Sequence, residues 1–472
     1  MKKGFLSNLR FYYFCALFPV MTAIQMTEGK ILPQILKFTF PLMLGNILQQ
    51  TYSLIDAAIV GKMLGVNALA SVGASVSIVF LILGFCQGCC CGFAIPVAQK
   101  LGARDMPAVR RTIWAGLRIS LYLSVVICIV TSLFCDKILA MMKTPQEIFD
   151  DAYSYLLITF ISIPFTFFYN LFSYLLRALG DSRTPFYFLL LATVINIVLD
   201  IFFIGVLGTG VGGAAVATLI AQAVSALFCY IYMKKHYPEA NPLPEEKHFS
   251  WHLTGTLLWI GIPIGLQFSI TAIGSIVLQT ANNVLGPVYV AAYAAAARIK
   301  MFFFSPLESL GMALATFAGQ NFGAVRKDRI SAGTKISIGL VMVYSVTAFA
   351  IIYFGAAQIA QLFVSADEAE VIAGTAKFLI ITTAFFPLLG LLCVLRYSIQ
   401  GCGFTALAML AGVFEMVART VVGIFGVPQW GYTAVCFGDP MAWIAANIFL
   451  IPAYMYVCSR LAKLKGPVLH AE

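Results

Sequence analysis

Four oxygen-bearing side chains stand inside long apolar runs of this chain, where polar residues are otherwise rare. They are Asp56, Asn196, Asp200 and Thr218. A charge in such surroundings is costly unless it faces a cavity or a partner, so these residues are candidates for function. Carboxylate, amide and hydroxyl oxygens are the ligands that hard cations prefer, and a carboxylate also binds a proton. The residue types therefore predict reversible binding of Na⁺ or H⁺ and of no other metal.

The spacing of these four residues predicts that they meet. Asn196 and Asp200 are four residues apart and share one helix face. Thr209 marks a glycine-rich turn, which Asp200 precedes by nine residues and Thr218 follows by nine. At about 1.5 Å per residue both lie roughly 13 Å from that turn, and Asp56 lies as far before another turn. We expect one joint site, whereas the alternative is a set of isolated hydrogen bonds between helices.

Other charged residues in the apolar runs allow more than one interpretation. Glu415 and Arg419 are four residues apart, which favours a structural ion pair. Lys300 and Glu308 are eight apart and could share a helix face towards a central cavity, where they would contact a substrate.

The apolar runs themselves determine the fold class. Hydrophobic residues make up 61% of the 472 residues and charged residues only 11%, against about 25% charged in soluble domains. Runs such as 187–206 and 336–354 are long enough to cross a bilayer. Lipid offers no hydrogen bonds to a bare backbone, and the alternation of a membrane β-barrel is absent. The sequence predicts an all-α polytopic membrane protein.

The apolar runs predict twelve membrane helices in two halves. The first six lie near residues 34–60, 68–97, 108–134, 152–177, 184–206 and 211–233. The other six lie near 255–284, 288–318, 330–355, 371–397, 404–427 and 432–459. The one long polar linker separates them. We therefore divide the chain into a cytoplasmic or interfacial extension (1–33), an N-lobe (34–233), a linker (234–251), a C-lobe (252–459) and a cytoplasmic tail (460–472).

The segment that precedes Met26 allows two interpretations. The apolar stretch 11–21 is too short to span a membrane and has no convincing cleavage site. The segment is either an amphipathic extension or an over-long gene model whose true start is Met26.

The two halves repeat each other. The segment Gln-Lys-Leu-Gly-Ala at 99–103 corresponds to Gln-Asn-Phe-Gly-Ala at 320–324, and Pro41 corresponds to Pro263 at nearly the same offset. Because each unit has an even number of helices, both copies enter the membrane from one side. The sequence predicts two pseudo-symmetric lobes around a central cavity.

The loop charges predict an orientation. The loops on one side hold most of the Lys and Arg residues, among them Lys100, Arg177, Lys234, Arg326 and Arg396; those on the other hold only Lys62, Lys137 and Lys143. By the positive-inside rule, both termini and the linker are cytoplasmic, which predicts a multi-pass protein of the plasma (inner) membrane.

Several other classes of protein are disfavoured. The net charge of +10 is spread over short loops with no nucleic-acid motif, so we expect no nucleic-acid partner. Cys86 and Cys89–91 have no histidine nearby, which favours helix packing over thiol or metal chemistry. A polytopic membrane enzyme is a remote alternative, because all four histidines lie in or next to the linker or in the tail and no nucleophile-elbow, zinc or phosphate-loop motif is present.

From Met26 onward the chain resembles the multidrug and toxic compound extrusion (MATE) family. The resemblance is carried by the first helix (41–65, with Gln49, Tyr52, Asp56 and Gly61), by Arg-Ala-Leu-Gly-Asp-Ser-Arg-Thr-Pro at 177–185, by Asn196 and Asp200, and by 212–215. It implies a V-shaped pair of six-helix bundles that exports small organic, often cationic, drugs and toxins by alternating access. Inward Na⁺ or H⁺ drives the export, no cofactor is needed, and we expect a monomer.

The resemblance also implies roles for particular residues. Asp56, Asn196, Asp200 and Thr218 match the family's cation-binding cluster, Gln49 and Asn170 match cavity-lining positions, and Pro41 matches a proline at which the first helix bends. Unlike one branch of the family, this chain has no acid in the seventh helix, so a second cation site in the C-lobe is not expected. A lipid-linked oligosaccharide flippase of the same superfamily is the alternative function.

Overall fold

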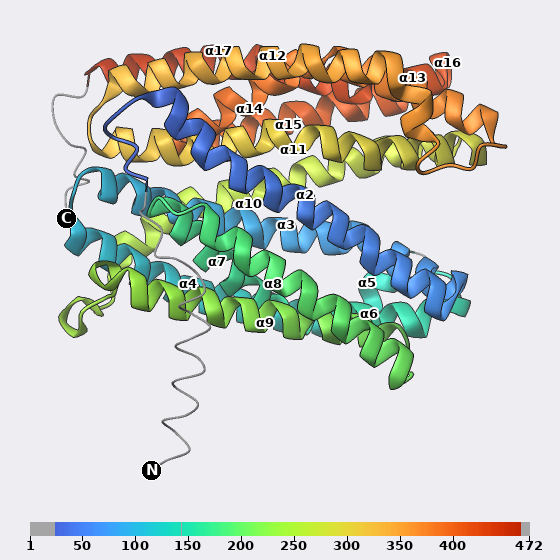
Figure 1. Ribbon diagram of the computed structural model, residues 1–472, viewed down its shortest axis with the longest axis horizontal. Helices are drawn as coiled ribbons and strands as arrows, with labels where there is room; N and C mark the ends of the chain where they lie inside the picture. The colour runs from blue at the N-terminus through green and yellow to red at the C-terminus, as the bar shows by residue number, and fades with distance from the viewer. Residues whose placement is uncertain (1–23, 143, 464–472) are drawn as a thin grey trace.

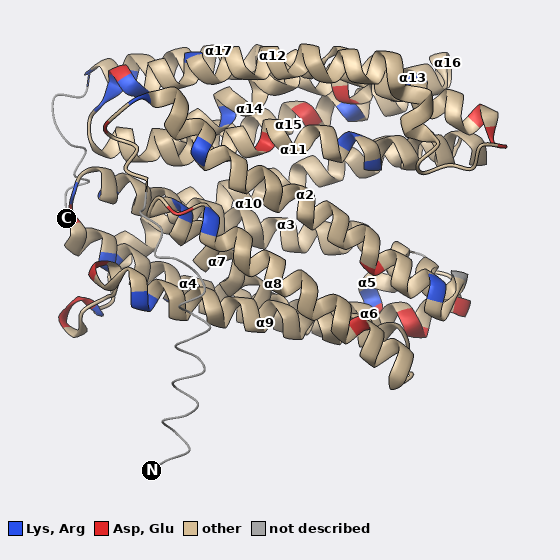
Figure 2. Ribbon diagram, viewed as in Figure 1, with Lys and Arg blue, Asp and Glu red and all other residues tan. Residues whose placement is uncertain are grey.

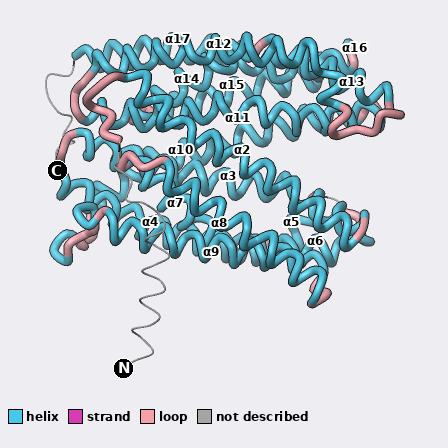
Figure 3. The backbone as a smooth tube through the Cα atoms, in the orientation of Figure 1, coloured by secondary structure: helices cyan, strands magenta, loops and turns pink. Residues whose placement is uncertain are grey.

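The computed structural model describes residues 24–142 and 144–463. Most of the N-terminal extension, Lys143 and most of the tail, for which the sequence also makes predictions, lie outside these residues. Every described segment is helix or loop (Figure 3), so the expected all-helical class is confirmed.

Sixteen α-helices make up the described chain. In the first half they are α2 (Ile31–Leu64), α3 (Val66–Gly102), α4 (Met106–Leu133), α5 (Cys135–Met141), α6 (Phe149–Ile161), α7 (Ile163–Ala178), α8 (Arg183–Asp200) and α9 (Gly210–His236). In the second half they are α10 (Trp251–Asn283), α11 (Pro287–Gly323), α12 (Lys327–Ala360), α13 (Ala369–Ala384), α14 (Phe386–Gly401), α15 (Thr405–Val421), α16 (Val427–Trp430) and α17 (Tyr432–Lys463). Two π-helical turns, η2 (Ile201–Val206) and η5 (Val422–Gly426), extend α8 and α15, and three short 3-10 turns lie in the loops: η1 (Gln146–Ile148), η3 (Pro238–Ala240) and η4 (Pro244–Glu246).

Ten of these helices are long and apolar enough to cross a membrane, and the number rises to twelve when two bent pairs are each counted as one span. The bends are 46° between α6 and α7 and 52° between α13 and α14. The expectation of continuous helices over 152–177 and 371–397 was therefore wrong. The physical reason is Pro164 and Pro387 at the start of α7 and α14, because proline lacks an amide hydrogen and clashes with the preceding turn.

The helices form two groups that lie together at one end of the molecule and diverge towards the other (Figure 1). Helix α2 begins beside the second group and ends beside the first, and it packs against both α11 and α8. Charged residues lie mostly near the two ends, apart from a series inside the second group (Figure 2).

Helices α3 and α10 join the two groups along a glycine face. Gly88 and Gly92 of α3 lie against Gly265 and Gly261 of α10, and a Cβ at any of the four would overlap the opposite helix. Small residues four apart let the backbones of membrane helices approach closely. Cys89, which lies on the same helix, is fully buried beside Gly265, in keeping with a packing role.

The repeated Gln-x-x-Gly-Ala segments meet where α3 and α11 end. Gln99 Nε2 donates to the carbonyl oxygen of Gly401 (3.0 Å), and Gln320 Nε2 donates to that of Ala178 (3.0 Å). Each glutamine thus reaches across to the other half. Gly323 lies so close to the Gln99 carbonyl that no side chain fits there. The repeated segments therefore hold the two halves together at this end of the molecule.

Residues 24–29 bind over this junction. Met26 is fully buried; its amide donates to Gln320 Oε1 (3.1 Å), and its carbonyl accepts from Asn321 (3.0 Å) and Arg329 (3.0 Å). On the other side, the amide of Ile24 donates to the carbonyl of Gly180 (3.0 Å). We call this set of contacts the terminal clasp, since it ties both halves to one segment.

Candidate functional site

The two aspartates of the first half face each other. Asp56 comes from the last third of α2 and Asp200 is the last residue of α8, and their carboxyl groups are within hydrogen-bonding reach. Asp200 is completely buried and Asp56 is partly buried. The structure therefore brings together two acids that are far apart in the chain.

A chain of polar contacts extends from this pair. With its amide oriented to satisfy both ends, Asn196 Nδ2 donates to Asp200 Oδ2 (2.8 Å) and Asn196 Oδ1 accepts from Thr218 Oγ1 (3.1 Å). The Thr218 hydroxyl also lies 3.1 Å from the hydroxyl of Tyr52. All four predicted cation-site residues thus belong to one cluster, which α2, α8 and α9 build.

Sequence reasoning missed two tyrosines of this cluster. Tyr52 precedes Asp56 by four residues, and this spacing could have placed both on one face of α2. Tyr155 of α6 lies close enough to Asp56 and Asp200 to interact electrostatically with both, and nothing in its sequence context indicates this.

The acid pair has unused ligand atoms. Oδ1 of Asp56 and Oδ1 of Asp200 are both buried and accept no hydrogen bond from the described part of the chain. Within that part, neither acid forms an ion pair. A buried polar atom without a partner is costly, and a cation or proton would satisfy both atoms.

Asp200 is also the last residue before the π-helical turn η2. Single π-helical turns occur often at functional sites, because they interrupt the regular hydrogen-bond ladder. The second half has its own π turn, η5, which begins at Val422, the position that the repeat makes equivalent to Ile201. The local geometry is therefore repeated although the acid is not.

Gln49 and Asn170 line a common cavity of about 40 Å³ between α2, α7 and α8, and Pro41, Arg177 and Met312 also line it. This space holds only a few water molecules. Pro41 lies inside α2, which continues through it as one helix.

Lys300 and Glu308 have separate partners, and neither lines this cavity. Lys300 forms an ion pair with Asp439 of α17 (2.5 Å), whereas Glu308 interacts electrostatically with Arg177 of α7. That the two residues share a face towards a central cavity therefore stays a prediction.

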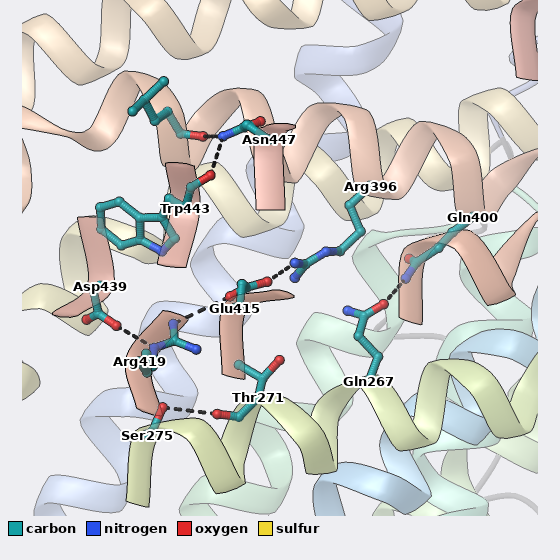
Figure 4. A network of polar contacts seen from close by, with 11 residues as sticks. Gln267, Thr271, Ser275, Arg396, Gln400, Glu415, Arg419, Asp439, Trp443 and Asn447 are labelled. Carbon is teal, nitrogen blue, oxygen red and sulfur yellow. Dashed lines mark hydrogen bonds and ion pairs between the residues drawn. The ribbon is translucent and has the colours of Figure 1, made fainter. Parts of the chain in front are cut away.

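A continuous series of charges crosses the second half (Figure 4). Arg396 pairs with Glu415, Glu415 with Arg419 (3.4 Å) and Arg419 with Asp439 (2.9 Å), and Asp439 also binds Lys300. The expected Glu415–Arg419 pair is present as part of this longer series. The placement of Arg396 in a loop was wrong, because α14 continues to Gly401 and buries it.

The acids of the two halves therefore differ in their charged partners. Asp439 has two cationic partners, and Glu415 likewise contacts two arginines. Among the described residues, Asp56 and Asp200 have only each other and neutral donors. A buried acid with cationic partners is compensated, whereas an acid pair without them requires an external cation.

Comparison with known proteins decides the family. The MatE family model matches residues 41–202 and 263–425, which is more than half of the chain. The chain belongs to the MatE family. The two matched segments correspond to the two halves of this MatE chain.

Individual relatives agree with this assignment. This MatE chain is 32% identical to the probable multidrug resistance protein YpnP of Bacillus subtilis, over 81% of this chain and 85% of YpnP. It is 23% identical to the multidrug export protein MepA of Staphylococcus haemolyticus, over 85% of this chain and 90% of MepA. A crystal structure of a MATE protein in complex with MaL6 superposes with a TM-score of 0.87 at 23% identity, over 94% of this chain and 100% of that chain. This last likeness shows that the fold is shared.

Proposed function

We propose that this MatE chain is a secondary active exporter of small organic molecules, coupled to Na⁺ or H⁺ at the Asp56–Asp200 pair. The names of YpnP and MepA support drugs as the substrate class, and the chain is not an enzyme. The single observation that carries the coupling role is the pair of facing carboxyl groups, each with a buried Oδ1 atom and neither with a cationic partner in the described chain.

The coupling follows from electrostatic repulsion. Two carboxylates in hydrogen-bonding reach of each other repel strongly in a medium of low dielectric constant, and Na⁺ or H⁺ removes that repulsion. Asp56 is on α2, which packs on both α8 and α11. A change in the packing of α2 on cation binding therefore reaches both halves. The coupling energy equals the difference in cation affinity between the two packings.

The cargo site that we propose includes Gln49 and Asn170, which lie on α2 and α7. Their cavity of about 40 Å³ is far smaller than the roughly 300 Å³ or more of a site for a drug-sized molecule. Cargo binding therefore requires the surrounding helices to separate, with Pro41 as the point at which α2 bends. Lys300 and Glu308 are not assigned to cargo, since each has a charged neighbour of its own.

We propose that residues 34–233 and 252–459 move as two lobes about the linker 234–251, within one chain acting as a monomer. We place both termini and the linker on the cytoplasmic side of the plasma membrane, because Lys and Arg exceed Asp and Glu in the loops at that end. Alternating access then means that the clasped end opens when the other end closes.

The deciding experiment measures efflux of a fluorescent organic cation, such as ethidium, from vesicles in which sodium and pH gradients are imposed separately. Asp56→Asn and Asp200→Asn are each expected to abolish gradient-driven efflux while expression and folding remain intact. Asp150→Asn, which changes an exposed acid, is the control. Wild-type efflux in both site variants would refute the coupling role.

A further inference from the structure

A second, larger concavity lies beside the cargo cavity, on the outer surface between α2 and α8. Its volume is about 650 Å³. The walls are mostly apolar and come from both helices: Leu36, Phe40, Met43, Leu44, Phe186 and Tyr187. Leu36 is 45% exposed and Phe40 56% exposed. In a bilayer such walls are covered by hydrocarbon, so the groove is shaped for an acyl chain.

Two cationic side chains also line this groove. Lys37 of α2 and Arg183 at the start of α8 are both exposed, and neither forms an ion pair within residues 24–142 and 144–463. Lys37 lies in the second turn of α2 and Arg183 is the first residue of α8, so both charges lie near the beginning of a span rather than midway along it.

The acid closest to Arg183 in sequence is already occupied. Asp181 is buried and accepts from the backbone amides of Arg183 and Thr184 (3.0 Å each), from the Thr184 hydroxyl (2.6 Å) and from the Tyr237 hydroxyl (3.2 Å). These bonds cap α8 and use both carboxylate oxygens. The guanidinium group of Arg183 thus remains available for an external anion, and a guanidinium fork fits a phosphate.

We propose that this groove binds an anionic phospholipid of the cytoplasmic leaflet, with its phosphate between Lys37 and Arg183 and an acyl chain against Phe40 and Leu44. The combination of an apolar groove and two uncompensated cations selects an acidic lipid over a zwitterionic one. Such a lipid is a ligand distinct from the cargo and from the coupling ion.

The groove also touches the transport machinery. Pro41 and Phe186 line both the groove and the cargo cavity. A lipid in the groove therefore contacts the proline at which α2 is proposed to bend. Its occupancy stabilises the packing of α2 on α8 that this structure shows.

The test is a native mass spectrometry titration of the full-length, delipidated protein with phosphatidylglycerol and, separately, with phosphatidylcholine of the same acyl chains. With two cationic contacts, we expect phosphatidylglycerol to bind roughly 30-fold more tightly than phosphatidylcholine. Lys37→Gln combined with Arg183→Gln should abolish this preference. Lys37→Arg combined with Arg183→Lys should keep it, which separates loss of charge from misfolding.

The matched control is Lys335→Gln combined with Lys463→Gln, which removes two exposed cations of the second half and should keep the preference. Equal binding of the two lipids by the wild type, or a preference that survives the Lys37 and Arg183 double variant, would overturn the proposal. Two further outcomes would also overturn it: equal competition by soluble glycerol 3-phosphate, which indicates a free-phosphate site, and displacement of the lipid by ethidium, which indicates a cargo entrance.

Discussion

At the scale of single residues, the chemistry of this protein depends on which acids have cationic partners. Asp200 and Asp439 are both buried, and both lie in helices of membrane-spanning length. Asp439 contacts Lys300 and Arg419, whereas Asp200 contacts Asn196 and Asp56. Residue type alone therefore does not define a cation site; the partners do.

Tyr52 offers a test of the cluster that leaves both acids in place. Tyr52→Phe removes the hydroxyl beside Thr218 but keeps the ring. The loss of one hydrogen bond of about 1 kcal/mol should raise the half-saturating concentration of the coupling ion about 5-fold, with a smaller effect on maximal rate. The measurement is ion-dependent efflux from vesicles, with Tyr122→Phe as the exposed control. An unchanged ion dependence would show that Tyr52 is not part of the site.

Asp439 should behave as a structural residue. Asp439→Asn leaves Lys300 and Arg419 without their shared counter-ion in a buried position. Breaking such a contact costs about 3–5 kcal/mol, so the melting temperature of the purified protein should fall clearly. Thermal unfolding followed by intrinsic fluorescence is the measurement, again with Asp150→Asn as control. A variant that keeps its stability but loses transport would instead assign Asp439 to the mechanism.

At the scale of the elements, contacts between helices hold the two halves of the molecule together more broadly than the linker does. The linker contacts α4, where Arg110 binds Glu246 (2.7 Å) and holds the pKa of that carboxyl below its ordinary value. Lys247 of the linker also lies over the Trp114 ring of α4. The broad contact between the halves is the glycine face of α3 and α10.

The α3–α10 contact predicts a strong effect at one glycine and a weak effect at another on the same helix. Gly92→Val places a branched side chain where the α10 backbone already lies, so the helices must separate. Overpacking of this kind costs about 1–3 kcal/mol or more. Gly73→Val is the control, because nothing lies within 4 Å of its added Cβ. Equal melting temperatures of the two variants would contradict the close approach.

At the scale of the whole molecule, the described conformation is closed at one end by the terminal clasp and the α3–α11 junction. Arg329 is central to the clasp: it donates to the carbonyls of Met26 (3.0 Å) and Gly29 (2.8 Å) and to the side chain of Asn321 (3.0 Å). Because the segment binds both halves, opening this end must break either these bonds or the bond from the Ile24 amide to the Gly180 carbonyl.

The clasp therefore predicts a change in the conformational equilibrium. Arg329→Gln should increase amide hydrogen exchange of residues 24–30 at least 10-fold, because charge-assisted hydrogen bonds are each worth about 1.5–3 kcal/mol. Arg326→Gln is the control, since Arg326 is half exposed and contacts Asp328 only at 3.7 Å. Unchanged exchange in Arg329→Gln would show that the clasp does not hold this end closed.

The sequence by itself determined the class and much of the acid cluster, and its twelve spans match the described helices when each bent pair is counted as one. Those features follow from patterns within one helix or from equal counts of residues to a shared turn, and both survive folding. The internal repeat likewise predicted that Gln99 and Gln320 play equivalent parts.

Only the tertiary structure decided which helices face each other and in which rotation. In the folded protein Arg396 pairs with Glu415, Tyr155 lies near the Asp56–Asp200 pair, and Lys37 and Arg183 line one groove. The physical reason is that an apolar helix in a membrane has no strong hydrophobic stripe to mark its buried side. The rotation of such a helix is set by close packing and by a few polar contacts between residues far apart in the chain. Neither can be predicted from the order of residues along one helix.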